Sequence, residues 1–142
     1  MQNLQQEVRP DNIISPITVT QAATTVTNEG MYRSMAKYHR GLMIITAQLT
    51  STKTAIAQLI CSSDSSGTGK ADVTGKTVTL MGTTSIPNQV GSIEFDCSDL
   101  TAIDQDKYWV GCDITTNQDG DSIQATLIRS AARYYEGPNM PS

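Results

Sequence analysis

The segment RGLMIITAQLTSTKTAIAQLICSSDSSGTGKADVTGKTVTLM, from Arg40 to Met81, decides the fold. It contains two strand-like apolar runs, a loop rich in Gly, Ser and Asp, and the start of a third run. Along the first run, every second residue from Met43 to Leu49 is apolar, whereas the alternate positions become polar toward Gln48. A period of two places these apolar side chains on one face, so the run predicts a strand that enters a hydrophobic core.

The second run, residues 54–63, has the same period of two. Small and large apolar residues share one face, and Ile56 and Ile60 lie on the other face between polar positions. The connection at residues 51–53 has the length of a hairpin turn, so we expect the two runs to pair as antiparallel neighbours. Beyond the second run the chain is polar and rich in glycine, which predicts a surface loop before the third run at residues 76–81.

The composition favours β-structure in one domain. A chain of 142 residues is long enough to bury a single apolar core without disulfides. Only 17 % of the residues are charged, and Thr, which suits half-buried strands better than helices, recurs in every apolar run. The formal net charge is −4 with no long block of either sign, so the sequence argues against a nucleic-acid partner.

The sequence shows no signal peptide before residue 20. No apolar run approaches the roughly 20 residues that cross a bilayer, so we expect a soluble protein made in the cytoplasm, without a membrane partner. Cys61, Cys97 and Cys112 are an odd number of cysteines without close pairing. Each stands where a strand would place an apolar residue, so we expect buried free thiols in a reducing compartment.

The rest of the chain repeats short alternating strands separated by turns. Residues 31–38 fit a short strand or an irregular entry into the first run. Ser98 or Asp99 is suited to cap a single helical turn through Ile103, and residues 117–120 end in Asp-Gly, a hairpin signal. The sequence predicts an all-β fold, a single antiparallel β-sandwich that is jelly-roll-like. Its expected strands lie at residues 17–27, 40–50, 54–63, 76–81, 92–98, 108–116 and 121–130, with a loop at 82–91.

Two polar terminal segments flank this body. Residues 1–16 carry Pro10 and Pro16, which push the preceding residues toward extended geometry, so we expect an extended N-terminal arm. The expected organisation is this arm, a β-sandwich domain at residues 17–130 and a C-terminal tail at 131–142. Apolar and aromatic residues in the two segments, with one Arg, form the candidate interface, since Tyr and Arg are enriched where proteins bind: Leu4, Val8, Ile13, Ile14, Arg133, Tyr134 and Tyr135. Alternatively, one of the two tyrosines closes the bottom of the sandwich.

The sequence offers no constellation for catalysis. The one histidine, His39, has no acidic or cysteine partner at a recognisable offset, and acid–base chemistry needs a second positioned group. The Gly67–Lys70 loop lacks the first glycine of a phosphate-binding loop. Asn117, Asp119 and Asp121 alternate as calcium ligands do, but the closing bidentate carboxylate is missing, which favours a plain hairpin. We therefore expect no enzymatic activity, no cofactor and no metal site.

The central block resembles a pattern in small virion proteins of tailed bacteriophages. The pattern is an apolar strand, a short polar turn, a T-x-x-A-x-L strand, a D-S-S-G-T-G loop and a G-K strand, followed later by a strand like Tyr108-Trp109-Val110. The resemblance covers residues 38–115. It implies a capsid decoration, or cement, protein: a β-sandwich bound outside the shell at contacts between major capsid subunits. Met, Cys and Gln stand where the pattern often has Ala or Val, and the arms have no counterpart, so contact residues are not carried over individually.

These observations predict a virion structural protein that decorates and stabilises the phage capsid by binding adjacent major capsid protein subunits. It is expected on the capsid exterior after assembly in the host cytoplasm, and its partners would be the major capsid protein and further copies of itself, as a dimer or a trimer. The first alternative is a neck or tail structural component. The second is a carbohydrate-binding β-sandwich for host attachment, although sugar sites usually present aromatic platforms and this chain has one Trp.

Overall fold

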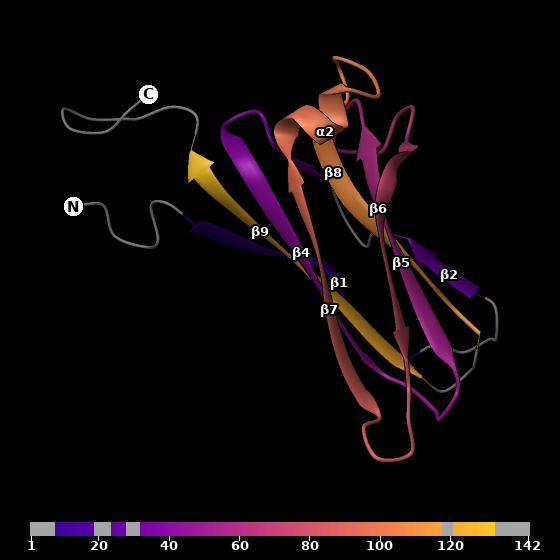
Figure 1. Ribbon diagram of the computed structural model, residues 1–142. Coiled ribbons are helices and arrows are strands. Elements are labelled where there is room, and N and C mark those ends of the chain that lie inside the picture. Colours follow the sequence, from indigo (N-terminus) through magenta and orange to yellow (C-terminus); the bar gives the residue numbers. More distant parts are fainter. Residues whose placement is uncertain (1–7, 19–23, 28–31, 118–120, 133–142) are drawn as a thin grey trace, which may run out of the picture.

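The computed structural model describes residues 8–18, 24–27, 32–117 and 121–132, which form two facing β-sheets and one short helix (Figure 1). The first sheet contains β1 (Val8–Thr18), β9 (Ser122–Ala132), β4 (Tyr38–Gln48) and β7 (Asn88–Asp96). The second contains β2 (Thr24–Thr27), β8 (Trp109–Thr116), β5 (Thr54–Ser62) and β6 (Ala71–Met81), and the short β3 (Arg33–Ser34) pairs with β8. The helix is α2 (Cys97–Thr101).

The strand order is that of a jelly roll. Neighbours run β1-β9-β4-β7 in the first sheet and β2-β8-β5-β6 in the second, and every pair is antiparallel. If β3 is set aside, described strands that follow each other along the chain lie in opposite sheets. The exception is the pair β5 and β6, which are neighbours in the second sheet. Apart from β3, four strands of each sheet are interleaved in this way, which is the double Greek key of a jelly roll. The predicted fold class, a single all-β antiparallel sandwich that is jelly-roll-like, is confirmed.

The core lies between the sheets and takes alternate residues from each strand. On β4 the buried face carries Met43, Ile45 and Ala47, as the alternation predicts. The three cysteines are buried free thiols, as expected. Burial raises the pKa of Cys112 to about 12, so this thiol stays protonated and acts as a small apolar residue. The other large side chains that are almost completely buried are Met35, Leu49, Leu59, Ile60, Leu100, Ile114, Ile123 and Leu127.

Both predicted hairpins are wrong. Residues 49–53 leave β4 in the first sheet and enter β5 in the second, and the segment between β8 and β9 also changes sheet. Such a crossing has the same length and turn chemistry as a hairpin. The period of two tells which face of a strand is buried but not which sheet the strand joins, because both sheets present an apolar face to the same core.

Three other boundaries differ from the expected ones. Residues 17–27 are not one strand, because β1 ends at Thr18 in the first sheet and β2 begins at Thr24 in the second. Residues 82–91 are not all loop, because β7 begins at Asn88 and pairs there with the end of β4. Strand β1 begins at Val8, within the segment expected to be an arm, and it runs extended along β9.

The short helix α2 is confirmed, but its cap is not the predicted one. The N-cap is Asp96, whose side chain accepts from the backbone of Asp99, while the Asp99 carboxylate accepts from Asp96 N at 2.8 Å. This reciprocal capping box satisfies backbone donors that the first turn leaves free. Leu100 then packs its buried side chain into the core. Within the described residues, no helix has the length and the apolar character required to cross a membrane.

The sheet edges are protected in two different ways. On one side β6 and β7 lie together: a Cβ added to Gly91 would approach Leu80 to within 2.8 Å, and Lys76 Nζ donates to the carbonyl of Glu94 at 2.9 Å. On the other side, the edge strand β1 contains two prolines and two register shifts, and β2 has only four residues. Prolines, bulges and short strands all discourage pairing with another chain.

Candidate functional site

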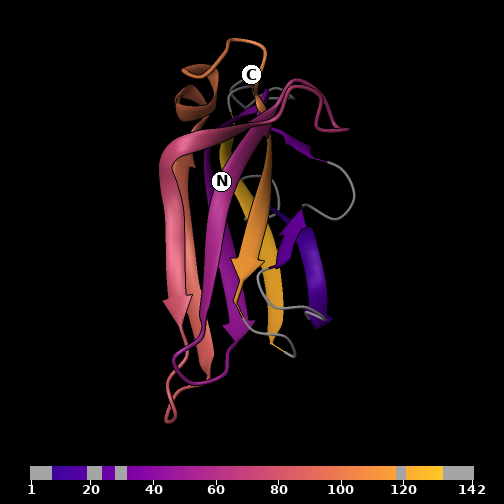
Figure 2. The same cartoon turned by 90° about the vertical axis from the view of Figure 1, so that its right-hand side faces the viewer.

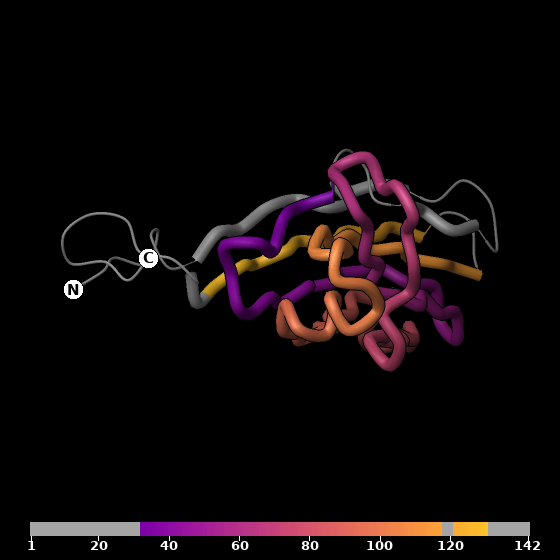
Figure 3. Tube along the Cα trace, turned by 90° about the horizontal axis from the view of Figure 1, so that it is seen from above, coloured from indigo at the N-terminus to yellow at the C-terminus, as the bar shows by residue number. Residues whose placement is uncertain are grey.

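The jelly roll has two ends, at the top and the bottom of Figures 1 and 2, and their side chains differ in chemistry. We call residues 46–57, 79–90, 114–117 and 121–124 the neutral end, which contains the turn below β6 and β7 in Figure 1. We call residues 32–41, 62–76, 94–109 and 128–132 the helical end; seen from above in Figure 3, α2 and the turn after it lie over the strand ends. Lys53 and Asp121 are the charged residues among the described parts of the neutral end, whereas the helical end carries most of the others.

Among residues 32–117 and 121–130, the neutral end carries four of the five large apolar side chains that are exposed. Ile56 on β5, Met81 at the end of β6, Ile86 in the next turn and Val90 on β7 are 45, 55, 60 and 68 % exposed. At the helical end Ile103 is 39 % exposed. Single exposed apolar residues are ordinary, but several gathered at one end where charges are depleted are typical of a protein–protein interface.

A groove on the outer face of the first sheet belongs to this surface. It encloses about 300 Å³ and runs between Thr46 on β4, Val90 on β7 and Gln124 on β9. None of the described residues that line it is charged. A partner that fills this groove therefore has to present neutral or apolar groups.

Backbone hydrogen bonds join the two turns of the neutral end. Thr52 N donates to the carbonyl of Gly82 at 2.9 Å, and Gly82 N donates to the carbonyl of Lys53 at 2.9 Å. Leu49 N donates to the carbonyl of Pro87 at 2.8 Å. Thr52 has a φ of +67°, a left-handed conformation that is rare for a β-branched residue. A surface held in one shape loses little conformational freedom when a partner binds.

Buried Asp121 also holds the neutral end. Its Oδ1 accepts from Thr50 N at 3.0 Å and from Thr50 Oγ1 at 2.8 Å, and Asn117 Oδ1 accepts from Thr54 N at 2.8 Å. Asn117 and Asp121 belong to the alternating set that was considered for calcium. Their side-chain oxygens instead accept hydrogen bonds from the turn between β4 and β5 and from the start of β5. Asp119 lies outside the described residues. In the described part of the chain, no three His, Cys, Asp or Glu side chains are grouped to hold a metal ion.

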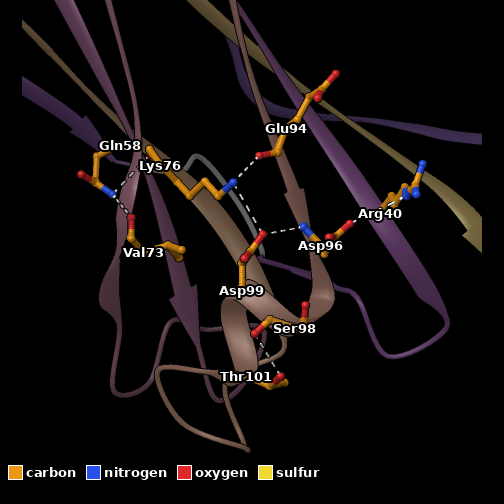
Figure 4. Close-up of polar contacts among 9 residues, drawn as sticks. All are labelled: Arg40, Gln58, Val73, Lys76, Glu94, Asp96, Ser98, Asp99 and Thr101. Carbon is orange, nitrogen blue, oxygen red and sulfur yellow. Dashed lines mark hydrogen bonds and ion pairs between the residues drawn. The ribbon is translucent and has the colours of Figure 1, made fainter.

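The helical end is organised by charges (Figure 4). Lys76 Nζ donates to the carbonyl of Glu94 and lies 3.6 Å from Asp99 Oδ2, which in turn accepts from Asp96 N. Arg40 Nε lies 3.8 Å from Asp96 Oδ1, and both side chains are exposed. An exposed ion pair of this kind contributes about 0–1 kcal/mol, so the network orients groups more than it stabilises the fold.

Gln58 on β5 shapes the strand that carries Lys76 (Figure 4). Its amide Nε2 donates to the carbonyl of Val73 at 2.9 Å and to that of Lys76 at 3.4 Å, across a shift in the register of β5 and β6. Gly75, with a φ of +79°, lies in this irregular part of β6. A bulge bends a strand and redirects its side chains, and here it accompanies the reach of Lys76 across to β7.

Two open grooves lie beside this network. One of about 560 Å³ is lined by Arg40, Lys76 and three carboxylates, and one of about 430 Å³ is lined by His39, Arg40 and Thr101 among others. His39 is exposed, and among the described residues no hydrogen bond orients it. Both signs of charge line the grooves at the surface, an arrangement that suits polar contact with another protein better than proton transfer.

The loop at residues 63–70 is ordered by Asp64. Its Oδ1 accepts from the backbone of Ser66 at 2.9 Å and of Thr68 at 3.0 Å, and its Oδ2 accepts from the Thr68 hydroxyl. These hydrogen bonds, that of the Thr68 hydroxyl first, hold the pKa of Asp64 below its ordinary value. Gly67 and Gly69 adopt positive φ angles, as glycines in turns often do. The predicted surface loop is confirmed for residues 64–70, but residues 71–75, which were also expected to be loop, belong to β6.

The predicted interface residues are only partly described. Val8, Ile13 and Ile14 lie on β1, where Val8 pairs with Ser130 and Ile14 with Ala125. The others lie outside the described residues: Leu4, Arg133, Tyr134 and Tyr135. Their role as contacts stays a prediction.

Solved structures of viral particles contain similar folds. A chain in the structure of infectious bursal disease virus, Gx strain, matches with a TM-score of 0.53 and 11 % identity, over 94 % of this chain and 33 % of that one. A chain of the T13 IBDV viral particle matches with a TM-score of 0.53 and 11 % identity, over 89 % of this chain and 32 % of that one. A chain of the infectious bursal disease virus VP2 subviral particle matches with a TM-score of 0.50 and 11 % identity, over 88 % of this chain and 32 % of that one.

This chain spans about a third of the length of those viral chains. At such low identity the likeness shows the fold alone, which is the jelly roll that these virus particles also contain. The sequence matches no protein-family model and no curated protein.

Sequence patterns missed the neutral end as a candidate surface. Ile86 and Val90 lie in a stretch predicted to be loop, and Ile56 was placed on a face interrupted by polar residues. One signal was available: from Thr77 to Ile93 the chain has no charged residue. A long uncharged stretch that has apolar residues at the outward-facing positions of a strand is unusual on a surface in contact with water.

Proposed function

We propose that this chain is a non-enzymatic virion structural protein that decorates and stabilises a phage capsid by binding adjacent major capsid protein subunits. The observation that supports the proposal most is the jelly-roll strand order of this chain, whose fold is similar to that of chains in solved virus particles. A jelly roll occurs in other classes of protein as well, including lectins, so the proposal also rests on the positions of the chain ends and on the surface charges.

The position of the chain ends supports attachment through arms. Val8, where the described chain begins, pairs with Ser130, and Ala132, where it ends, pairs with Tyr38. Both terminal segments therefore start side by side at the helical end. Two arms that leave from one place are suited to reach two neighbouring capsid subunits, and each weak contact raises the effective concentration of the next.

The mixed-charge surface of the helical end supports the same orientation. Arg40 and Asp96, which are exposed, and Asp99 and Lys76, which are partly exposed, offer both signs of charge to a partner. Complementary charges give specificity and register more than raw affinity, which suits a protein that docks at one kind of site on a repeated lattice. In this proposal the helical end faces the shell, from the exterior, after assembly in the host cytoplasm.

The copy number per particle tests this function. Purified particles of the phage that encodes the chain are digested, and this chain and the major capsid protein are quantified by mass spectrometry with labelled peptide standards. We expect a simple stoichiometric ratio to the major capsid protein, amounting to hundreds of copies. A dozen or fewer copies per particle would move the protein to the neck or tail, and absence from particles would reject a virion role.

A further inference from the structure

We propose that the neutral end is a self-association surface at which two or more copies of this chain meet. The proposal rests on the proposed function for its setting in a virion. It deepens that function because it says where copies of a decorating protein contact each other. Its chemistry is a property of the isolated chain and is open to test without particles.

The neutral end has the composition of an interface core. Four large apolar side chains, on β5, β6, the next turn and β7, are about half exposed or more: Ile56, Met81, Ile86 and Val90. On the outer face of the second sheet, Ile56 pairs with Thr79 and Thr54 pairs with Met81, so Ile56 and Met81 are diagonal neighbours. Val90 forms one wall of the neutral groove on the first sheet. The apolar surface thus reaches both outer faces around one end.

Charge identifies the partner as a second copy. The chain has a formal net charge of −4. Copies that approached through their helical ends would bring together charges of both signs, among them the like charges of Asp96, Asp99, Asp104 and Asp106 on and after α2. Copies that approach through their neutral ends bring together no surface carboxylate among the described residues, since Asp121 is buried. Like-charge juxtaposition is costly at an interface, and at the neutral end the partly exposed Lys53 is the one surface charge among the described residues, so two copies bring the fewest like charges together there.

A symmetric contact also fits the rest of the molecule. In an isologous interface both copies use the same patch, so the patch must be compatible with itself. An uncharged patch with Thr hydroxyls and with Asn and Gln amides meets this condition. A strongly charged partner would find no complementary group in the described groove. The described chain ends lie at the opposite end of the sandwich, so contact here leaves both arms of each copy available to the shell.

The shape of this surface is already fixed. The turns at residues 49–53 and 82–87 are joined by backbone hydrogen bonds and by a contact of 3.2 Å between the hydroxyls of Ser51 and Thr84. Thr52 is held there in a left-handed conformation. Strained backbone persists where the surrounding structure over-determines it, and such positions cluster at functional sites.

Sedimentation of the purified full-length chain tests the proposal. Three variants are compared with the wild type: Val90→Asp and Ile86→Asp at the neutral end, and Ile103→Asp as a matched control at the helical end. We expect reversible association of the wild type, a dissociation constant at least about tenfold weaker for Val90→Asp and Ile86→Asp, and no change for Ile103→Asp. All three positions are exposed, so circular dichroism and thermal unfolding should show folded protein in each case.

Salt provides a second readout. Association through an uncharged apolar surface should be unchanged or strengthened by sodium sulfate, whereas association through ion pairs weakens as salt rises. The proposal is overturned if the wild type stays monomeric up to roughly 100 μM, if Ile103→Asp weakens association as much as Val90→Asp, or if salt dissociates the oligomer. It is also overturned if the full chain is monomeric while a chain ending at Ala132 associates, because the C-terminal segment would then cover the surface. None of these results bears on the copy number per particle.

Discussion

The two ends of this jelly roll are built from the same strands but are held together by different chemistry. At the neutral end, backbone groups of two turns bond to each other, and the single described carboxylate is buried. At the helical end, the surface carboxylates Asp64, Asp96 and Asp99 accept from backbone N–H groups and order the loops. The neutral end should therefore keep its shape over a wide range of pH and salt, while the helical end should respond to both. Four predictions test this difference, from the largest effect to the smallest.

Replacement of Gly82 by Ala should cause the largest loss of stability. The added Cβ would lie 2.6 Å from the carbonyl oxygen of Thr50 and 2.7 Å from that of Leu49, so backbone of the neutral end has to move. We expect a loss of about 3 kcal/mol in the free energy of unfolding, measured in urea. The control is Gly75→Ala in β6. No surrounding atom would lie within 4 Å of the added Cβ, and the left-handed φ should lower the free energy of unfolding by about 1–2 kcal/mol. Equal losses for the two variants would contradict the rigid packing of the neutral turns.

Replacement of Asp121 by Ala should come next. The change removes the buried carboxylate that accepts from both Thr50 N and Thr50 Oγ1, so we expect a loss of about 2 kcal/mol in the free energy of unfolding. The matched change at the helical end is Asp64→Ala, which frees backbone groups that water can reach. Chemical unfolding of both variants compares the two ends. A larger loss for Asp64→Ala would reverse the expected order.

Acid should loosen the loop of the helical end before the turns of the neutral end. The pKa of Asp64 is lower in the folded protein than in the unfolded chain, so its contribution is complete above the ordinary carboxyl pKa of about 3.9 and is lost as the pH falls through the lower folded value. Hydrogen-exchange protection of the Ser66 and Thr68 amides should therefore fall below about pH 4. The Thr52 and Gly82 amides, which donate to backbone carbonyls, should keep theirs.

The variant Asp64→Asn is the control for this acid effect. It removes the titrating group but keeps an Oδ1 that can accept from Ser66 N and Thr68 N, so protection of these two amides should be independent of pH between neutral and acid conditions. If the wild-type loop and the neutral turns lose protection together, acid acts on the whole sandwich, and the contrast between the ends is wrong.

Replacement of Thr52 by Asn should have the smallest effect, and the effect should be stabilising. Asn tolerates the left-handed region far better than a β-branched residue, so relief of the strain should raise the free energy of unfolding by roughly 0.5–1 kcal/mol. The same substitution at Thr79, an exposed strand position, should instead be slightly destabilising because Asn has a low strand propensity. A loss of stability for Thr52→Asn would show that the Thr side chain compensates the strain.

The alternation of apolar residues predicted the central parts of most strands and most of their buried faces. Met43 and Ile45, Ile93 and Phe95, and Ile123 and Leu127 point inward as their spacing requires. The assignment of strands to sheets was not predictable in the same way. A crossing between sheets and a hairpin use the same short polar turns, and only the joint burial of both inner faces decides between them.

The helix and the candidate surface show the same limit. A helical turn near residue 98 was predicted from capping residues, but Asp96 and Asp99 both fit the pattern, and the reciprocal bonds between them appear only in three dimensions. Ile86 and Val90 come together with Ile56 and Met81 at one end because β5, β6 and β7 start or finish there. Sequence spacing alone does not bring these positions together, although the missing charges between Thr77 and Ile93 indicate a special surface.

A cryo-electron microscopy reconstruction of purified particles tests the central claim most directly, because it shows both where the chain lies and which of its ends meets what. We expect jelly-roll density repeated over the outside of the shell, with the α2 end toward the major capsid protein and the neutral ends of neighbouring copies in contact. Density at a single neck or tail position, or copies that bind the shell through the turns at residues 49–53 and 82–87 and do not touch each other, would contradict the account.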